Sequence, residues 1–237
     1  MKCLIVPGVG GSEAQHWQSW LQQQLPDTQR VEQDQWDQPI IQVWVDRLIE
    51  ILQTLQQPTQ LVAHSFGCLT SVVALAQRPD LFSQISKLVL VAPANPERFS
   101  HRGLRQSGEA SIANLLPAQA LSVPSCLIAS RTDPWLDFAT AQCWAQRWQS
   151  HLIDLGDAGH INVAAGFGAW PDLMQYLHSD TLPVKGWANT AVTTVAATVL
   201  PFNNASNNLS NNASNSAAQH GSQRSNSTAS RLFSSSF

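Results

Sequence analysis

Three side chains of the kinds that carry out acyl transfer stand far apart in this sequence: Ser65, Asp133 and His160. A serine hydroxyl becomes a competent nucleophile when a neutral imidazole accepts its proton. The imidazole in turn needs a carboxylate to fix its tautomer and to stabilise its charged form. Ser65, Asp133 and His160 are therefore candidates for the nucleophile, the orienting acid and the base of one site, provided that the fold brings them together.

The candidate nucleophile lies in the stretch QLVAHSFG, residues 60–67. The apolar run 60–63 predicts a strand and residues 66–77 predict a helix, so Ser65 stands at a strand-to-helix turn, as in a nucleophile elbow. The usual elbow pattern is Gly-x-Ser-x-Gly, and Ala63 takes the place of its first glycine. Because serine is also a favoured helix N-cap, the motif by itself leaves a purely structural role for Ser65 open.

Two backbone N–H groups near the serine are expected to form an oxyanion hole. One belongs to Phe66, at the N-terminus of the predicted helix. The other is expected from Val9 or Gly10, in the glycine-rich turn that follows the first apolar run. This turn lacks the Lys-Ser/Thr of a phosphate-binding loop and the third glycine of a dinucleotide site, so we expect no cofactor there.

Apolar and amphipathic stretches alternate up to about residue 180 and supply the scaffold for these residues. The apolar run 87–91 predicts a strand buried on both faces, whereas apolar residues at helical spacing predict helices. The irregular segment 94–117 is expected on the side of the sheet where loops cover a site. The predicted strands are 3–6, 30–36, 60–63, 87–91, 125–129 and 151–154, and the predicted helices open at Ser12–Glu13, Gln38–Pro39, Phe66, Asp137 and Trp170.

Strands that alternate with helices in this way predict an α/β fold, a mostly parallel sheet with helices on both faces. In such a fold the loops at the carboxyl ends of the strands meet at one edge of the sheet. Ser65, Asp133 and His160 each follow a predicted strand. Their order along the chain, Ser…Asp…His, is that of the α/β-hydrolases and differs from the orders of other serine hydrolases.

Other residues near the strand ends have both structural and functional interpretations. His64 precedes Ser65 in an elbow whose neighbouring side chains point apart, so we expect it to pack or to line the pocket. Trp36 and Trp135 stand at strand ends and are candidates for the pocket wall. Asp137 is placed to cap the helix that follows it. The remaining histidines that we expect at the surface or on helices are His16, His101, His151 and His178.

The composition of the 237 residues indicates one globular domain followed by a segment of different character. Residues 1–180 carry the apolar runs of the α/β domain. Residues 181–202 are predicted to be a linker or a β-prone extension. Residues 203–237, rich in Asn and Ser, cannot bury enough apolar surface to order themselves and are predicted to be disordered. The net charge of −3 implies no basic face, so we expect no nucleic-acid partner.

The cysteines and the first residues bear on where the chain works. The four cysteines have no metal-ligand spacing and are predicted to be buried free thiols of a reducing compartment, so we expect no metal. The apolar run 3–6 is too short for the core of a signal peptide, and no run of about 18 apolar residues occurs. We therefore expect a soluble cytoplasmic protein without a membrane span. The four are Cys3, Cys68, Cys126 and Cys143.

Short motifs spread over residues 3 to about 178 form a specific set, although each is weak by itself. The set comprises IVPGxGG from Ile5, WxxP from Trp36, VAHSxG from Val62, LVAPA from Leu90, SxxDP from Ser130 and GxxGHIN from Gly156. Together they resemble the small serine hydrolases related to YdeN and to retinoblastoma-binding protein 9. The resemblance implies a compact α/β-hydrolase that lacks the two leading strands of larger relatives.

The same resemblance implies hydrolase chemistry through Ser65, Asp133 and His160. The family pattern usually carries glycine at the position of Ala63, and the segment after residue 180 has no counterpart in it. We therefore expect a serine hydrolase that cleaves carboxylic esters or related acyl bonds of a small-molecule substrate. The alternative is a protein-interaction module that keeps the hydrolase scaffold with little turnover, although the sequence indicates no particular protein partner.

Overall fold

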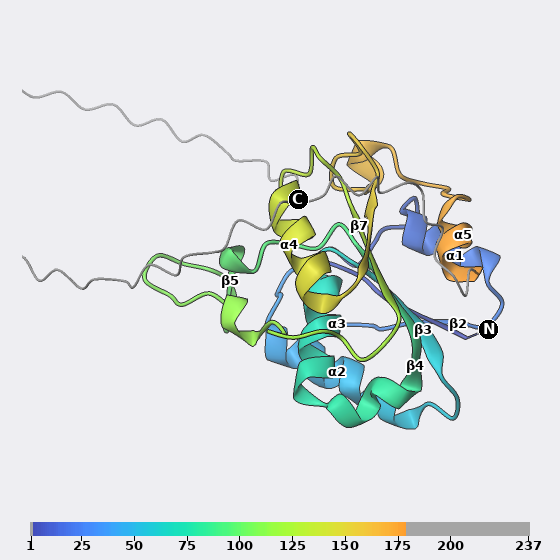
Figure 1. The fold of residues 1–237 in the computed structure, drawn as a ribbon, viewed down its shortest axis with the longest axis horizontal. Helices are drawn as coiled ribbons and strands as arrows, with labels where there is room; N and C mark the ends of the chain where they lie inside the picture. The colour runs from blue at the N-terminus through green and yellow to red at the C-terminus, as the bar shows by residue number, and fades with distance from the viewer. Residues whose placement is uncertain (1, 179–237) are drawn as a thin grey trace, which may run out of the picture. The chain divides into compact units, whose positions relative to one another are not determined.

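A six-stranded, wholly parallel sheet runs through the centre of the computed structural model, which describes residues 2–178 (Figure 1). The strands lie side by side in the order β2-β1-β3-β4-β7-β8. The predicted fold class is confirmed, whereas the segments 181–202 and 203–237 lie outside the described residues. The strands are β1 (Cys3–Val6), β2 (Thr28–Arg30), β3 (Thr59–His64), β4 (Ile85–Val91), β7 (Ser125–Ala129) and β8 (His151–Asp154).

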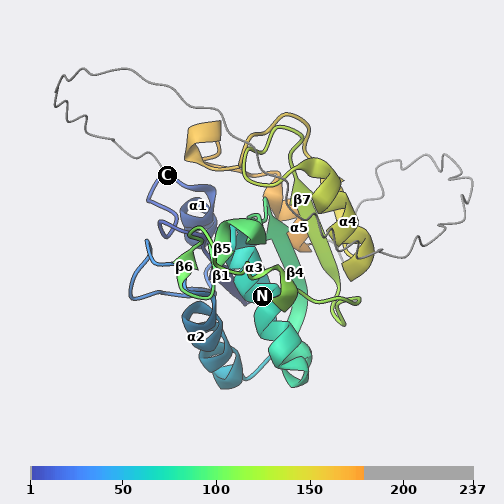
Figure 2. The ribbon, with the colours of Figure 1, turned by 90° about the vertical axis from the view of Figure 1, so that its left-hand side faces the viewer.

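Helices cover both faces of this sheet (Figures 1 and 2). Helices α1 and α5 pack on one face, and α2, α3 and α4 pack on the other, as the two buried clusters show. Four short 3-10 helices lie in the connections: η1 (Pro79–Gln84), η2 (Pro96–Arg98), η3 (Ala113–Leu115) and η4 (Val163–Ala165). The helices are α1 (Trp17–Gln24), α2 (Ile41–Thr54), α3 (Phe66–Gln77), α4 (Phe138–Trp148) and α5 (Leu173–His178).

Strand β4 shows why the central strands are apolar throughout. Leu88 and Leu90 contribute to the cluster under α2, α3 and α4, whereas Val89 and Val91 contribute to the cluster under α1 and α5. All four side chains are fully buried. Successive side chains of a strand point to opposite faces, so a strand covered on both faces needs apolar residues at every position.

Two predicted elements differ most from the observed ones, while the helices expected to open at Gln38–Pro39 and at Trp170 begin at Ile41 and Leu173. The first helix begins at Trp17 instead of Ser12–Glu13, because Ser12 has a φ of 58° and His16 caps the helix by accepting from Gln18 N–H. The predicted strand 30–36 is wrong, since β2 covers only Thr28–Arg30. The chain leaves the sheet edge after β2 and crosses to the glycine-rich turn, where the Trp36 carbonyl accepts from the N–H of Gly10.

The segment 94–117 carries only short elements, as its irregular sequence suggests. After η2, strands β5 (Phe99–Ser100) and β6 (Gly103–Leu104) form a small antiparallel hairpin outside the main sheet. Within the described residues, no helix is long and apolar enough to cross a bilayer. All four cysteines are unpaired, but Cys143 is exposed, so the prediction that every thiol is buried is wrong.

Candidate active site

Ser65 stands at the sharp turn between β3 and α3, with a φ of 53° and a ψ of −121°. This positive φ is unfavourable for a residue with a side chain, and backbones of this kind persist only where the surroundings hold them. Three backbone hydrogen bonds do so: Ser65 N–H donates to Val91 at 3.1 Å, and the Ser65 carbonyl accepts from Cys68 at 3.0 Å and from Ala94 at 3.2 Å. The turn is thereby tied to the end of β4.

The two glycine positions of the elbow pattern behave differently. A Cβ added at Gly67 would lie 2.2 Å from the carbonyl oxygen of Val6, so this position requires glycine. Ala63, at the place of the first glycine, is fully buried in the core between the sheet and helices α2, α3 and α4. Gly8 also needs its small size, since a Cβ there would lie 2.8 Å from that of Ser65. The close approach of β1 and its turn therefore depends on Gly8 and Gly67.

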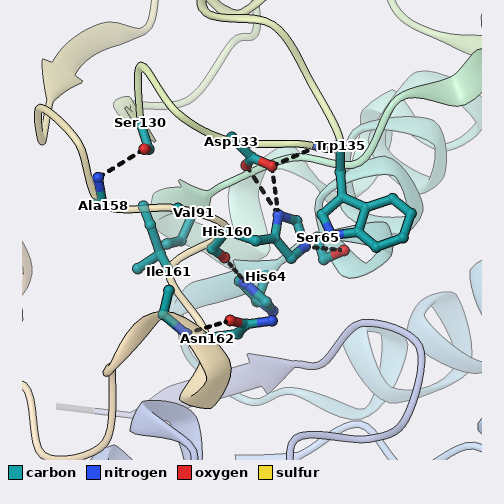
Figure 3. A network of polar contacts seen from close by, with 12 residues as sticks. His64, Ser65, Val91, Ser130, Asp133, Trp135, Ala158, His160, Ile161 and Asn162 are labelled. Atoms are coloured by element: carbon teal, nitrogen blue, oxygen red, sulfur yellow. Dashed lines mark hydrogen bonds and ion pairs between the residues drawn. The ribbon is translucent and has the colours of Figure 1, made fainter. Parts of the chain in front are cut away.

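The candidate nucleophile, base and acid form one continuous chain of hydrogen bonds (Figure 3). His160 Nε2 lies 2.9 Å from Ser65 Oγ. On the other side of the ring, Nδ1 lies 3.0 Å and 2.9 Å from the two carboxylate oxygens of Asp133. A carboxylate accepts the hydrogen of Nδ1, which leaves the lone pair of Nε2 facing the serine hydroxyl. The arrangement can therefore move a proton from Ser65 to His160.

The loops after β7 and β8 are fastened to each other, which sets the distance between the carboxylate and the imidazole. Ser130 Oγ accepts from Ala158 N–H at 2.9 Å and donates to the Gly156 carbonyl at 3.2 Å. The Asp133 side chain is 3% exposed and also accepts from Trp135 N–H at 2.8 Å. A nearly buried carboxylate held by two kinds of donor has little freedom to turn away from His160.

Hydrogen bonds to the residues that follow His160 hold its segment in place. Asn162 caps η4 by accepting from Ala165 N–H at 3.1 Å. The Ile161 carbonyl accepts from the indole N–H of Trp17 at 2.8 Å.

Asp137 lies outside this network. It caps α4 by accepting from Thr140 N–H, which confirms its predicted structural role.

His64 lies beneath His160 and contacts its backbone. His64 Nε2 is 3.0 Å from the carbonyl oxygen of His160, and because a carbonyl can only accept, this nitrogen carries the hydrogen. Burial holds the pKa of His64 well below its usual range, and the nearby His160 and His16 lower it further. A neutral His64 can therefore support the His160 loop without adding charge beside the imidazole.

His16 was expected at the surface or on a helix; it is the N-cap of α1, and at 3% exposed it does not lie at the surface. Its Nδ1 accepts from Gln18 N–H at 3.1 Å, and its ring centroid lies 4.9 Å from that of His64. Burial, with a contribution from the charge of Arg30, lowers the pKa of His16 to about 4. The only sequence signal that could have located it is its position directly before the first helix.

The predicted oxyanion donors lie in different hydrogen-bonding environments. Phe66 is the first residue of α3, where backbone N–H groups have no partner within the helix. The N–H of Gly10 donates to the Trp36 carbonyl at 3.1 Å, so it is already engaged. Val9, the neighbouring residue of the same turn, is therefore the better candidate for the second donor.

The two tryptophans proposed for the pocket wall have different neighbours. Trp36 packs against Gly11 of the glycine-rich turn, where an added Cβ would meet its ring at 2.8 Å. Trp135 lies beside His160, with ring centroids 6.1 Å apart (Figure 3). The Arg98 guanidinium carbon stands over the Trp135 ring, 3.7 Å from its centroid. The irregular sequence around Arg98 contains nothing that indicated this contact.

Metal ligation has no candidate cluster in the part of the chain that the structure describes: no three His, Cys, Asp or Glu side chains are grouped to hold an ion.

Known proteins similar to this chain are serine hydrolases and YdeN-like proteins. The protein-family model for serine hydrolases matches residues 3–179. The YdeN protein of Bacillus subtilis (strain 168) is 26% identical over 180 residues, which make up 74% of this chain and 93% of that protein.

Solved structures are similar over the same region. A YdeN-like protein from Pectobacterium atrosepticum is 38% identical, with a TM-score of 0.66 over 74% of this chain and 88% of that one. The ydeN gene product of B. subtilis is 23% identical and shares the fold, with a TM-score of 0.58 over 75% of this chain and 97% of that one.

Proposed function

Because this chain belongs to the serine hydrolase family, with YdeN-like proteins among its relatives, we propose that it cleaves carboxylic esters or related acyl bonds of small molecules through an acyl-enzyme. The observation that carries the proposal is the continuous hydrogen-bond chain from Asp133 through His160 to Ser65. A neutral imidazole, a carboxylate and a serine hydroxyl are the three groups that such chemistry requires.

In the first half of the reaction, Ser65 Oγ attacks the acyl carbonyl while His160 Nε2 takes its proton. Asp133 holds Nδ1–H and stabilises the imidazolium that forms. The N–H groups of Phe66 and Val9 donate to the developing oxyanion, and each such donor is worth about 3–4 kcal/mol of barrier. The imidazolium then protonates the leaving group, which departs and leaves the acyl group on Ser65.

In the second half, water replaces the leaving group. His160 Nε2 takes a proton from the water as its oxygen attacks the acyl carbon, and the same two N–H groups again stabilise the oxyanion. Collapse of the tetrahedral intermediate breaks the bond to Ser65 Oγ, which regains its proton from His160. The acid product leaves and the site returns to its starting state.

The test is labelling of the full chain with a fluorophosphonate probe, together with hydrolysis of short 4-nitrophenyl esters. We expect Ser65→Ala to abolish labelling and to lower kcat by at least about a thousandfold. Ser71→Ala is the matched control, because this buried serine of α3 only donates to the Gly67 carbonyl. Equal labelling of wild type and Ser65→Ala, or no ester turnover by the wild type, would favour the interaction-module alternative.

We also propose that the protein is located in the cytoplasm. The observation that supports it is the absence of a disulfide among the four cysteines, including the exposed Cys143, since exposed free thiols are typical of reducing compartments. Fractionation of the native host cells with an antibody to the chain would test it.

A further inference from the structure

Arg98 presents an unpaired cation next to the candidate active site. Its guanidinium lies over the Trp135 ring at 3.7 Å, and among the described residues it has no hydrogen-bond or ion-pair partner besides this stacking. Two other arginines have ion-pair partners: Arg105 pairs with Glu97 at 2.9 Å, and Arg131 pairs with Asp154 at 2.6 Å. A guanidinium stacked by its face keeps its N–H groups free at its edge.

The pKa of Arg98 also differs from that of a paired arginine. Partial burial lowers the pKa of Arg98 from its ordinary value, whereas the hydrogen bond to Asp154 raises that of Arg131. Guanidinium nonetheless stays charged at any pH that a protein experiences. Arg98 is thus a partly desolvated cation without a counter-ion of its own in residues 2–178.

The position of Arg98 is tied to the elbow. Ala94 N–H donates to the Ser65 carbonyl, and Asn95 then caps the 3-10 helix η2 that ends at Arg98. The Arg98 carbonyl accepts from Arg105 N–H at 2.9 Å, which anchors the other end of the helix to the hairpin. The cation is therefore held near the site by backbone contacts on both sides.

Trp135 connects this cation to the reacting groups. Its ring contacts the guanidinium at 3.7 Å and also lies edge-on to His160, with ring centroids 6.1 Å apart. The guanidinium and the imidazole therefore contact the same indole ring, and a small acyl chain can span the distance between them. Arg98 is exposed and borders an open hollow of about 550 Å³ beside the hairpin, so a solute can reach it.

We propose that Arg98, stacked on Trp135, binds a carboxylate on the acyl chain of the substrate, so that the preferred substrates are monoesters or related monoacyl derivatives of dicarboxylic acids. This inference rests on the proposed acyl hydrolysis at Ser65 and names its substrate class. A carboxylate is favoured because its two oxygens in one plane match the free edge of a guanidinium. A single unpaired cation also suits a single negative charge better than a phosphate dianion.

The experiment compares two esters that differ only in charge. The mono-4-nitrophenyl esters of adipic and suberic acid carry a terminal carboxylate, and the corresponding esters with a terminal carboxamide are neutral and nearly the same shape. The readout is the ratio of kcat/KM for the anionic ester to kcat/KM for the neutral ester, measured on the full chain. For the wild type we expect a ratio of about 10 to 100 for at least one chain length, as for a charge-assisted hydrogen bond.

Arg98→Gln is expected to bring this ratio close to one, and Arg98→Lys to leave an intermediate value, because lysine keeps the charge without the fork or the stacking. Arg102→Gln, on the exposed turn of the same hairpin, removes the same charge and is the matched control that should leave the ratio unchanged. An unchanged ratio in Arg98→Gln, or an equal fall in Arg102→Gln, overturns the inference.

The two proposals fail in different ways. If the wild type turns over both esters equally well, the carboxylate preference is wrong and acyl hydrolysis stands. If the wild type turns over neither ester, or if Ser65→Ala retains the activity, the hydrolase proposal is wrong and the substrate inference fails with it.

Discussion

His160 has two unlike neighbourhoods. On one side lie His64 and His16, which are both buried. Burial lowers their pKa values and keeps them uncharged, and each forms a hydrogen bond with a backbone group. On the other side lie Trp135 and Arg98, which are at least partly exposed, with a positive charge that has no described counter-ion. The buried side can hold the imidazole in place, whereas the open side can meet a substrate.

The difference follows from what each side is attached to. His64 ends strand β3 and therefore shares the rigidity of the central sheet. Arg98 and Trp135 stand in connections beyond the strand ends, where the chain is free to vary without loss of the core. Substitutions on the buried side should therefore disturb stability or the reaction step, and those on the open side should change which molecules are accepted.

The largest expected effect comes from the buried backbone of the elbow. Gly67→Ala should lower the free energy of unfolding by about 3 kcal/mol, because its methyl group would lie 2.2 Å from the Val6 carbonyl oxygen and backbone must move. Gly108→Ala is the control on the open side: no atom lies within 4 Å of an added Cβ there. Its positive φ alone should cost about 1 kcal/mol. Urea denaturation that gives equal losses would contradict the steric account.

The next effect concerns pH. Because the pKa of His16 is about 4 in the folded chain and about 6.5 in the unfolded chain, the unfolded state binds more protons between these values. The contribution of His16 to the free energy of unfolding is therefore fully present above about pH 6.5. It is lost as the pH falls, by about 2 kcal/mol at pH 5.

The measurement is the pH dependence of urea unfolding for wild type and His16→Asn, a variant that keeps a helix-capping side chain and cannot titrate. Relative to wild type, the variant should gain about 2 kcal/mol between pH 7 and pH 5. His101→Asn, at the exposed hairpin turn, is the matched control for the substitution itself. Parallel curves for wild type and His16→Asn would show that His16 is not held neutral by the fold.

The smallest expected effect comes from the hydrogen bond between His64 and the His160 carbonyl. His64→Leu should lower kcat by about tenfold with little change in KM, because the imidazole of His160 loses a support that fixes its position. His64→Gln places an amide N–H where Nε2–H was and should recover most of kcat. A loss in both variants alike would assign His64 a packing role, and no loss in either would remove it from the positioning of His160.

Much of the scaffold was predictable from the sequence. The strands 125–129 and 151–154 and the helix 66–77 occur as predicted, because each has a local pattern of apolar residues that fits one kind of element. Asp137 as a helix cap was predictable for the same reason, since capping acts between neighbouring residues.

The sequence-based prediction was wrong where contacts between distant parts of the chain determine the local structure. The predicted strand 30–36 has suitable residues, but only Thr28–Arg30 pairs with β1, and Trp36 is drawn to the glycine-rich turn instead. The same contact engages the N–H of Gly10, one of the candidate oxyanion donors. A hydrogen bond between segments that are far apart in the sequence thus outweighs the local strand propensity of residues 31–36.

The sequence by itself determined which residue types stand at the ends of which strands, and so identified Ser65, Asp133 and His160 as candidates for one site. That was possible because apolar periodicity is local and parallel strands end at a common edge. Only the tertiary structure placed His16 against His64 and Arg98 over Trp135, the two rings that contact His160. Their placement depends on strand order and on loop paths, which no local pattern along the chain records.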